Sequence, residues 1–232
     1  IGLIEPTSGC ASILGQNALA HNSKLLEKVG YLPGALALYK NLTGREYLRY
    51  LSKLRKVDCT KEIASLAERM DLDLDKHIHD LSKGNRQKIG VVQAFMHKPE
   101  VLILDEPTSG LDPLIQREFE GMLQEVKDRG AAVLLSSHVL SEVEHLADQI
   151  AVISEGKILI NENIATLKDK ATHTITLTFP QPVNRARYEG VVHVISAIGN
   201  NLVCSTTGSE ATLLKMAVED GVLRGLVRGQ RD

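Results

Sequence analysis

The spacing of hydrophobic positions changes twice along the chain. From 43 to 97 they recur every three or four residues, which predicts a group of helices. From 101 to 160 short apolar runs alternate with helical spacing, which predicts parallel strands joined by helices, in a sheet covered on both faces. Within 172–232 the expected order is strand, short helix, strand, strand, helix, strand. That order favours a small ferredoxin-like module.

Start and stop signals set the boundaries of these elements. Thr43 and Glu46 form a capping box at the start of one expected helix. Asp112 and Pro113 open another, which Gly130 ends. The expected helices are 23–28, 43–54, 61–70, 82–97, 113–130, 141–146 and 209–220. The expected strands are 10–14, 29–32, 101–104, 132–135, 150–153, 157–160, 172–179, 191–198, 201–206 and 222–227.

Composition and charge exclude several classes of protein. The 232 residues are 43% hydrophobic and 24% charged and carry a net charge of −2, as in ordinary globular proteins. Because the balance is not basic, we expect no nucleic-acid partner. Three widely separated cysteines fit a reducing compartment better than a disulfide framework or a metal cluster. The sequence has no signal peptide and no apolar run near the roughly 18 residues of a membrane helix. It begins at Ile1 in mid-pattern, so we expect an internal piece of a longer protein.

The most informative segment is VLILDEPTSGLD at 101–112, where an apolar strand runs directly into Asp105 and Glu106. Two adjacent carboxylates at the end of a buried strand are costly unless a cation or a reacting group compensates them. The interpretation is a site for metal-assisted phosphoryl chemistry. Asp105 would hold Mg²⁺, directly or through water, and Glu106 would be the general base that polarises an attacking water. The alternative is a solvated acidic loop, but the apolar strand and the Pro107-Thr108 turn favour a site.

A second copy of EPTSG occurs at 5–9 and serves as a control. Glu5 has neither a preceding aspartate nor an apolar strand before it, so the segment predicts a turn only.

The segment LSKGN at 81–85 lies at the start of an expected helix. Ser82 can cap the helix, and Gly84 lets backbone N–H groups approach an anion at the positive end of the helix dipole. Alone, this pentapeptide predicts an N-cap and nothing more.

Asp112 and His138 each have a structural and a functional interpretation. Asp112 caps the helix that begins at Pro113, and it can do so while serving a site. His138 follows a buried strand, where a neutral imidazole could contact a γ-phosphate and hold a catalytic water. A single histidine in such a place is more often structural. The position of His138 in the order of motifs along the chain therefore decides between the two interpretations.

Taken in order, LSKGN, VLILDE, SGLD and SSH resemble the signature, Walker B, D-loop and switch histidine of an ABC transporter ATPase. The resemblance covers about 1–165, and the stretch at 30–48 is similar to the Q-loop region of daunorubicin-resistance-type bacterial exporters. It implies an incomplete P-loop NTPase domain over 1–165, a helical subdomain at about 43–97, and an α+β ferredoxin-like accessory domain over 172–232.

The resemblance also implies residue roles, a cofactor and partners. Asp105 would bind Mg²⁺, Glu106 would act on the water, and His138 would contact the γ-phosphate of ATP. In a head-to-tail dimer, ATP held by a second ATPase subunit would be contacted by the signature residues Ser82, Lys83, Gly84 and Asn85. Asp112 would couple the two sites. Such a subunit lies on the cytoplasmic face of the plasma membrane, bound to a transmembrane permease that the ATP cycle drives.

The sequence departs from the family pattern at three places. The usual signature is LSGGQ, so Lys83 and Asn85 are variants, and Lys83 adds a positive charge near the phosphates. Gly34 stands where the Q-loop glutamine is expected, so a contact with magnesium and water is lost. No G-x-x-x-x-G-K-[ST] loop occurs in the 232 residues. We therefore expect weak ATP binding or none by this chain alone, a missing central strand, and an exposed apolar sheet edge.

The expected function is the ATP-hydrolysing subunit of an exporter, inactive alone without a Walker A loop. The alternative is a non-hydrolysing regulatory partner that donates only its signature loop to an intact ATPase. That alternative is disfavoured by the presence of Asp105, Glu106 and His138, because a subunit that donates only its signature loop would not need them. A third class, soluble ABC proteins of translation or DNA repair, usually carries a tandem cassette, a coiled coil or a basic surface. None of these is visible in the sequence.

Overall fold

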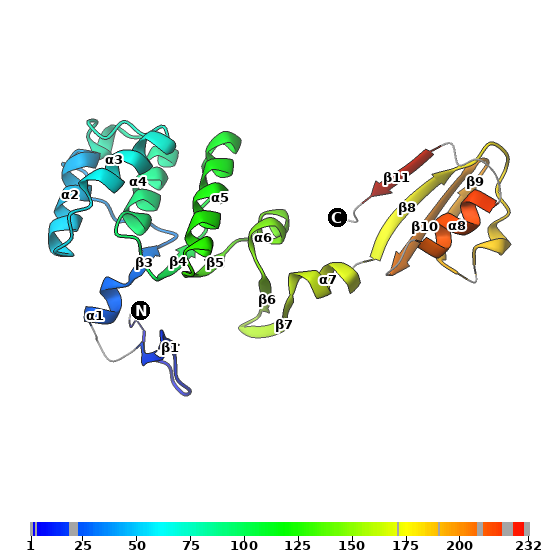
Figure 1. Cartoon of the computed structure of the whole chain (residues 1–232), viewed down its shortest axis with the longest axis horizontal. Helices are drawn as coiled ribbons and strands as arrows, with labels where there is room; N and C mark the ends of the chain where they lie inside the picture. The colour runs from blue at the N-terminus through cyan, green and yellow to red at the C-terminus, as the bar shows by residue number, and fades with distance from the viewer. Residues whose placement is uncertain are drawn as a thin grey trace. The chain divides into compact units, whose positions relative to one another are not determined.

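The chain divides into two compact units, Ile1–Leu146 and Ala147–Asp232 (Figure 1). The computed structural model describes residues 2, 4–18, 23–170, 172–189, 191–207, 211–219 and 225–229. Each unit has its own hydrophobic core.

A parallel sheet forms the base of the first unit. It consists of β3 (Val29–Leu32), β4 (Val101–Asp105) and β5 (Ala132–Ser136), in the order β3-β4-β5. All three were expected from short apolar runs, and their parallel pairing is confirmed. The strands end together, so the segments after them meet at one edge of the sheet.

The helices of the first unit follow the sequence signals closely. They are α1 (Ser23–Glu27), α2 (Gly44–Leu54), α3 (Thr60–Arg69), α4 (Lys83–Phe95), α5 (Pro113–Asp128) and α6 (Leu140–Leu146), with a 3-10 turn at Ile78–Asp80. The capping box is present: the Thr43 hydroxyl accepts from the Glu46 backbone N–H, and the Glu46 side chain accepts from the Thr43 N–H. Both predicted caps of α4 and α5 are also made, by Ser82 and Asp112.

The group of helices α2 to α4 is joined to α5 by Arg69. Its guanidinium makes two hydrogen bonds of 2.9 Å to the Glu125 carboxylate and a further ion pair with Glu118. The hydrogen bonds from Arg69 lower the pKa of Glu125. A bidentate pair of this kind restricts orientation, so it helps hold the helices over the sheet.

One face of the sheet packs against α4 and α5, and the opposite face is covered only in part within the described residues. Leu32, Leu102 and Leu104 point into the core, where they pack with residues of α4 and α5. The register places Tyr31, Ile103 and Leu134 in one row on the opposite face. On that face Val29 and Val101 are also buried, whereas Leu134 is 66% exposed, so cover on both faces is confirmed only in part for the described residues.

The strand expected at 10–14 is instead one arm of a hairpin. β1 (Ser12–Ile13) pairs antiparallel with β2 (Gln16–Asn17). Leu14 and Gly15 between them both have positive φ, 50° and 72°, as a type I′ turn requires. Leucine is rare in that conformation, so the residue at the first turn position does not indicate a turn. The EPTSG copy just before the hairpin contains bends and no helix or strand, as expected.

The second unit contains a hairpin and a separate antiparallel sheet. The hairpin is β6 (Gln149–Ser154) with β7 (Lys157–Asn163), followed by α7 (Ile164–Lys170). The sheet has the order β11-β8-β10-β9. Its strands are β8 (Thr172–Thr178), β9 (His193–Ile198), β10 (Asn201–Thr207) and β11 (Gly225–Gly229), with a 3-10 turn at Arg185–Arg187 and α8 (Ala211–Glu219). This strand order and the antiparallel pairing confirm the ferredoxin-like module.

The division between the units falls after Leu146, whereas the expected ATPase domain extends to 165. The difference is the β6–β7 hairpin, which groups with the second unit. The domain boundaries expected from the family resemblance, 1–165 and 172–232, therefore stay a prediction.

Candidate functional site

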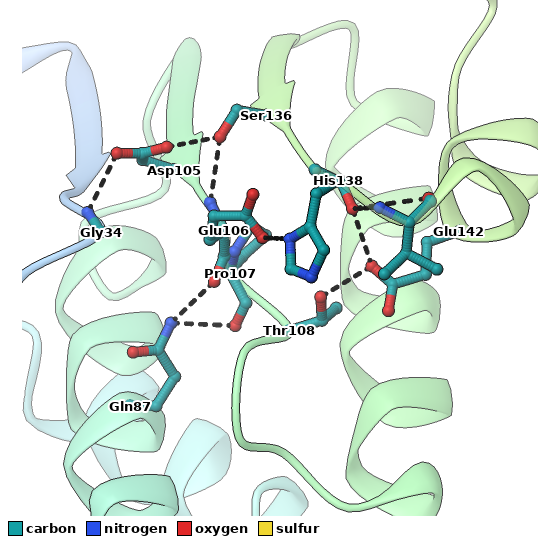
Figure 2. Close-up of polar contacts among 11 residues, drawn as sticks. Gly34, Gln87, Asp105, Glu106, Pro107, Thr108, Ser136, His138 and Glu142 are labelled. Atoms are coloured by element: carbon teal, nitrogen blue, oxygen red, sulfur yellow. Dashed lines mark hydrogen bonds and ion pairs between the residues drawn. The ribbon is translucent and has the colours of Figure 1, made fainter.

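The candidate site lies where the parallel strands end. Gly34 comes just after β3, Asp105 is the last residue of β4, and Ser136 is the last residue of β5. Figure 2 shows their side chains and backbone groups meeting in one hydrogen-bonded set. The carboxyl edge of a parallel sheet is the usual place for a ligand in α/β proteins, and it is where the sequence predicted the site.

Asp105 is held by two donors. One carboxylate oxygen, Oδ1, accepts from the Ser136 hydroxyl, and Oδ2 accepts from the Gly34 backbone N–H at 3.3 Å. A Cβ at position 34 would lie 2.8 Å from Oδ2, so the glycine permits this close approach of the loop. The residue at the Q-loop position thus contacts Asp105 through its backbone.

Glu106 adopts a left-handed backbone conformation, with φ of +49°. Such a conformation costs about 1–2 kcal/mol for a residue with a side chain and persists only where its surroundings impose it. The Glu106 N–H donates to the Ser136 carbonyl at 3.2 Å and to the Ser136 hydroxyl at 3.1 Å. These bonds turn the backbone sharply at the end of β4, which separates the Glu106 side chain from that of Asp105 (Figure 2).

The Glu106 carboxylate contacts His138. Oε2 lies 2.7 Å from the imidazole Nδ1, and the side chains are 32% and 77% exposed respectively. With Nδ1 protonated, the ring donates to the carboxylate, and Oε1 is the other oxygen available to a water molecule. The structure therefore brings together Gly34, Asp105, Glu106 and His138, as the order of the motifs predicted.

Two side chains that support this set, Gln87 and Glu142, were not predicted from the sequence. Gln87 on α4 is buried, and its amide donates to the carbonyls of Glu106 at 3.2 Å and Pro107 at 3.1 Å. Glu142 on α6 accepts from Thr108 and Ser137. Gln87 lies in the polar first half of α4, KGNRQK, so the sequence carries no signal that sets it apart from its neighbours. Glu142 follows His138 by four positions, which is weak information without the fold.

The signature residues make local contacts. The Ser82 hydroxyl accepts from the Asn85 N–H at 3.1 Å, Lys83 is the exposed first residue of α4, and Asp112 accepts from Leu114 and Ile115 at 3.1 Å. A Cβ on Gly84 would lie 2.6 Å from the Gly110 carbonyl oxygen. The turn therefore packs against the segment that carries Asp112. This contact is a second reason for a glycine, besides the predicted approach of an anion.

The donor set at Asp105 is compatible with Mg²⁺. Each Asp105 oxygen has one hydrogen-bond donor in the structure, which leaves lone pairs available, and the residue is exposed. Carboxylate oxygen suits this ion, which is usually held by one or two carboxylates together with substrate phosphates. Among the described residues no group of three or more His, Cys, Asp or Glu side chains could hold a metal by itself.

Comparison with known proteins gives the family. The family described as ABC transporter matches residues 1–109. In an alignment 239 positions long, the chain is 31% identical to the bacitracin transport ATP-binding protein BcrA of Bacillus licheniformis. The alignment covers 96% of this chain and 75% of that protein. The chain belongs to the ATP-binding proteins of ABC transporters. It is therefore an ABC subunit with the P-loop NTPase fold of a family that binds ATP, which confirms the resemblance stated from its motifs.

Two further matches describe how much of an ABC subunit the chain represents. It is 38% identical over 168 residues to the bacitracin transport ATP-binding protein BcrA of Enterococcus faecalis, covering 71% of the chain and 54% of that protein. The chain thus spans about half the length of this relative. A solved structure titled as the ATP binding subunit of an ABC transporter superposes with a TM-score of 0.68 at 29% identity, covering 72% of each chain. Within the described residues of this ABC subunit, no helix has the length and hydropathy needed to cross a membrane.

Proposed function

We propose that this ABC subunit supplies the water-activating side of an ATP site and that hydrolysis there powers a membrane exporter. The observation that supports this most directly is the Glu106 carboxylate, set at the end of β4 and 2.7 Å from His138 Nδ1. A carboxylate fixed in orientation, with one oxygen bonded and the other available, is arranged as a general base would be.

Glu106 would take up the proton of the attacking water as the γ-phosphoryl group is transferred. A positioned general base contributes about 10²–10⁴ in rate, so Glu106 is the residue whose loss should matter most. His138 would hold the carboxylate in orientation through Nδ1–H. Its Nε2 would donate to an oxygen of the γ-phosphate when the ring is protonated on both nitrogens.

Asp105 would hold Mg²⁺, with Ser136 and Gly34 fixing the orientation of its carboxylate. The ion, when bound, supplies charge neutralisation at the β- and γ-phosphates.

The remaining predicted residues would act across a dimer. Ser82, Lys83, Gly84 and Asn85 would contact ATP bound by a second ATPase subunit in a head-to-tail arrangement, since the N-terminus of α4 offers unpaired N–H groups to an anion. Asp112 would couple the two sites through the segment against which Gly84 packs. The dimer would drive a transmembrane permease from the cytoplasmic face of the plasma membrane.

Hydrolysis is best tested in the complete gene product with its membrane partner. No G-x-x-x-x-G-K-[ST] loop occurs in the 232 residues, so these residues alone are expected to bind ATP weakly or not at all. Glu106→Gln should lower ATP turnover at least about a hundredfold while ATP binding persists. The matched control is Glu155→Gln, because Glu155 is an exposed glutamate with the same φ of +49° in the β6–β7 turn.

Undiminished turnover in Glu106→Gln would refute the assignment of the base. A wild-type product that binds ATP without hydrolysing it would favour the alternative, a regulatory partner that donates only its signature loop.

A further inference from the structure

The loop that carries His138 has little packing to hold it. The His138 side chain is 77% exposed, and its contact with Glu106 is a single hydrogen bond at the surface. A hydrogen bond of this kind contributes little net stability, because water competes for both groups. The position of the ring must therefore depend on the backbone of residues 137–139.

Ser137 organises that backbone. Its hydroxyl oxygen accepts from the Val139 N–H at 3.0 Å, which closes a turn around His138. The same hydroxyl lies 3.2 Å from Oε2 of Glu142, to which it donates. The turn that presents His138 is thus tied to the first turn of α6 through one carboxylate oxygen.

Thr108 donates to that same oxygen from the other loop of the site. Its hydroxyl lies 2.8 Å from Glu142 Oε2, and the residue is only 7% exposed. Thr108 stands two positions after Glu106. One oxygen atom of Glu142 therefore joins the loop that follows the proposed base to the loop that carries the histidine (Figure 2).

We propose that Glu142 is a positioning residue that keeps His138 within hydrogen-bond distance of Glu106 by bridging Thr108 and Ser137. The proposal has two parts. The geometric part, that Glu142 holds His138 near Glu106, does not depend on the function proposed above. The functional part, that this affects ATP turnover, rests on that proposed function. Both bonds are charge-assisted, and such bonds are about twice as strong as those between neutral groups. The bond between His138 and Glu106 also has a carboxylate acceptor, but the His138 side chain is 77% exposed and Thr108 is only 7% exposed, so water competes less with the bridge. The bridge therefore sets the loop geometry, and the contact of His138 with Glu106 follows from it.

The geometric part is tested on the chain itself by amide exchange at Val139 and by nitrogen NMR of the His138 ring. Glu142→Ala should lower the protection of the Val139 amide about tenfold and remove the hydrogen-bonded signal of His138 Nδ1. Glu142→Gln keeps an acceptor oxygen at the same reach, so it should retain the signal and lose no more than about threefold in protection. Ser141→Ala, an exposed neighbour on α6, is the matched control and should change neither readout.

An unchanged His138 signal and unchanged Val139 protection in Glu142→Ala would overturn the proposal. If Glu142→Ala does not fold, Thr108→Val decides, because it removes one donor of the bridge and leaves the bond from the Val139 N–H to the Ser137 hydroxyl in place. Thr108→Val must then reproduce the loss of protection, and failure to do so would equally overturn the proposal.

The functional part is measured on the complete gene product. Glu142→Ala should lower kcat about tenfold with KM for ATP unchanged, and Glu142→Gln should recover most of the loss. Equal losses in the Gln and Ala variants, or a change confined to KM, would refute positioning. If the wild-type product hydrolyses no ATP, the proposed function fails while the exchange and NMR results still decide the role of Glu142.

Discussion

The buried amide of Gln87 offers a quantitative test of how the site is built. Gln87 on α4 donates to the Glu106 carbonyl at 3.2 Å and to the Pro107 carbonyl at 3.1 Å, and it is 6% exposed. Gln87→Leu keeps the approximate volume and removes both donors. The Glu106 carbonyl retains a hydrogen bond from the Ser109 N–H, whereas the Pro107 carbonyl keeps no other bond among those of the described residues.

The expected cost follows from these partners. Losing the bond to Glu106 costs about 1 kcal/mol, and leaving the Pro107 carbonyl unpaired in a buried position costs about 1–3 kcal/mol. The added apolar burial of leucine offsets about 1 kcal/mol. The net loss is about 1–3 kcal/mol, which is comparable with the roughly 1–2 kcal/mol stored in the left-handed backbone of Glu106. Without Gln87 we expect residue 106 to relax, which would move the proposed base.

Local opening of residues 101–112 is the appropriate measurement, because the chain has two units and a single unfolding free energy is not defined. Hydrogen exchange in Gln87→Leu should accelerate there by about 5- to 160-fold, using 1.36 kcal/mol per factor of ten. Gln93→Leu is the control on the same helix. Its side chain only accepts from the Tyr47 hydroxyl at 2.8 Å, so exchange at 101–112 should stay near the wild-type rate. Equal acceleration in both variants would refute the reasoning.

The remaining predictions concern packing and pH. Gly30→Ala should destabilise the first unit by about 3 kcal/mol, because a Cβ would lie 2.2 Å from the Ala94 carbonyl oxygen. Gly121→Ala, in α5, should stabilise the first unit by about 0.5–1 kcal/mol, because a Cβ there would have no neighbour closer than 4.0 Å. Denaturant titration followed by hydrogen exchange compares the stability of the two variants. A loss of stability of equal size in both variants would contradict the packing argument. Burial, with a smaller contribution from Arg55, lowers the pKa of His97 to about 4 from 6.5. The unfolded chain therefore binds the extra proton first, and stability should fall by about 1–2 kcal/mol, after allowance for partial exposure, as the pH drops from about 6.5 to about 4. His97→Gln should flatten that part of the titration, and an unchanged slope would exclude His97 as its source.

The sequence contained enough information to predict the centre of the site. An apolar strand followed by two carboxylates has few structural explanations, and the caps Thr43, Ser82 and Asp112 are local signals that the structure reproduces. The ferredoxin-like strand order was also predictable, because the order of elements along the chain restricts the topology to few choices.

What the sequence could not provide were contacts between distant segments. Gln87 reaches a carbonyl 19 positions away, and Thr108 meets Glu142 34 positions away. No periodicity encodes such pairs, since they depend on how α4 and α6 lie against the end of β4. The hairpin around Leu14 was missed for a different reason: its residue type is atypical of the backbone conformation that it adopts.

The partly covered face of the sheet in the first unit has a consequence for handling the protein. β3 and β5 are the outer strands of the described sheet, and on β5 the Leu134 side chain is 66% exposed beside the half-buried Ile103. Apolar area beside unpaired backbone groups promotes association between copies of a chain. We therefore expect protein concentration, more than temperature, to determine how long a purified sample of these 232 residues stays free of aggregates.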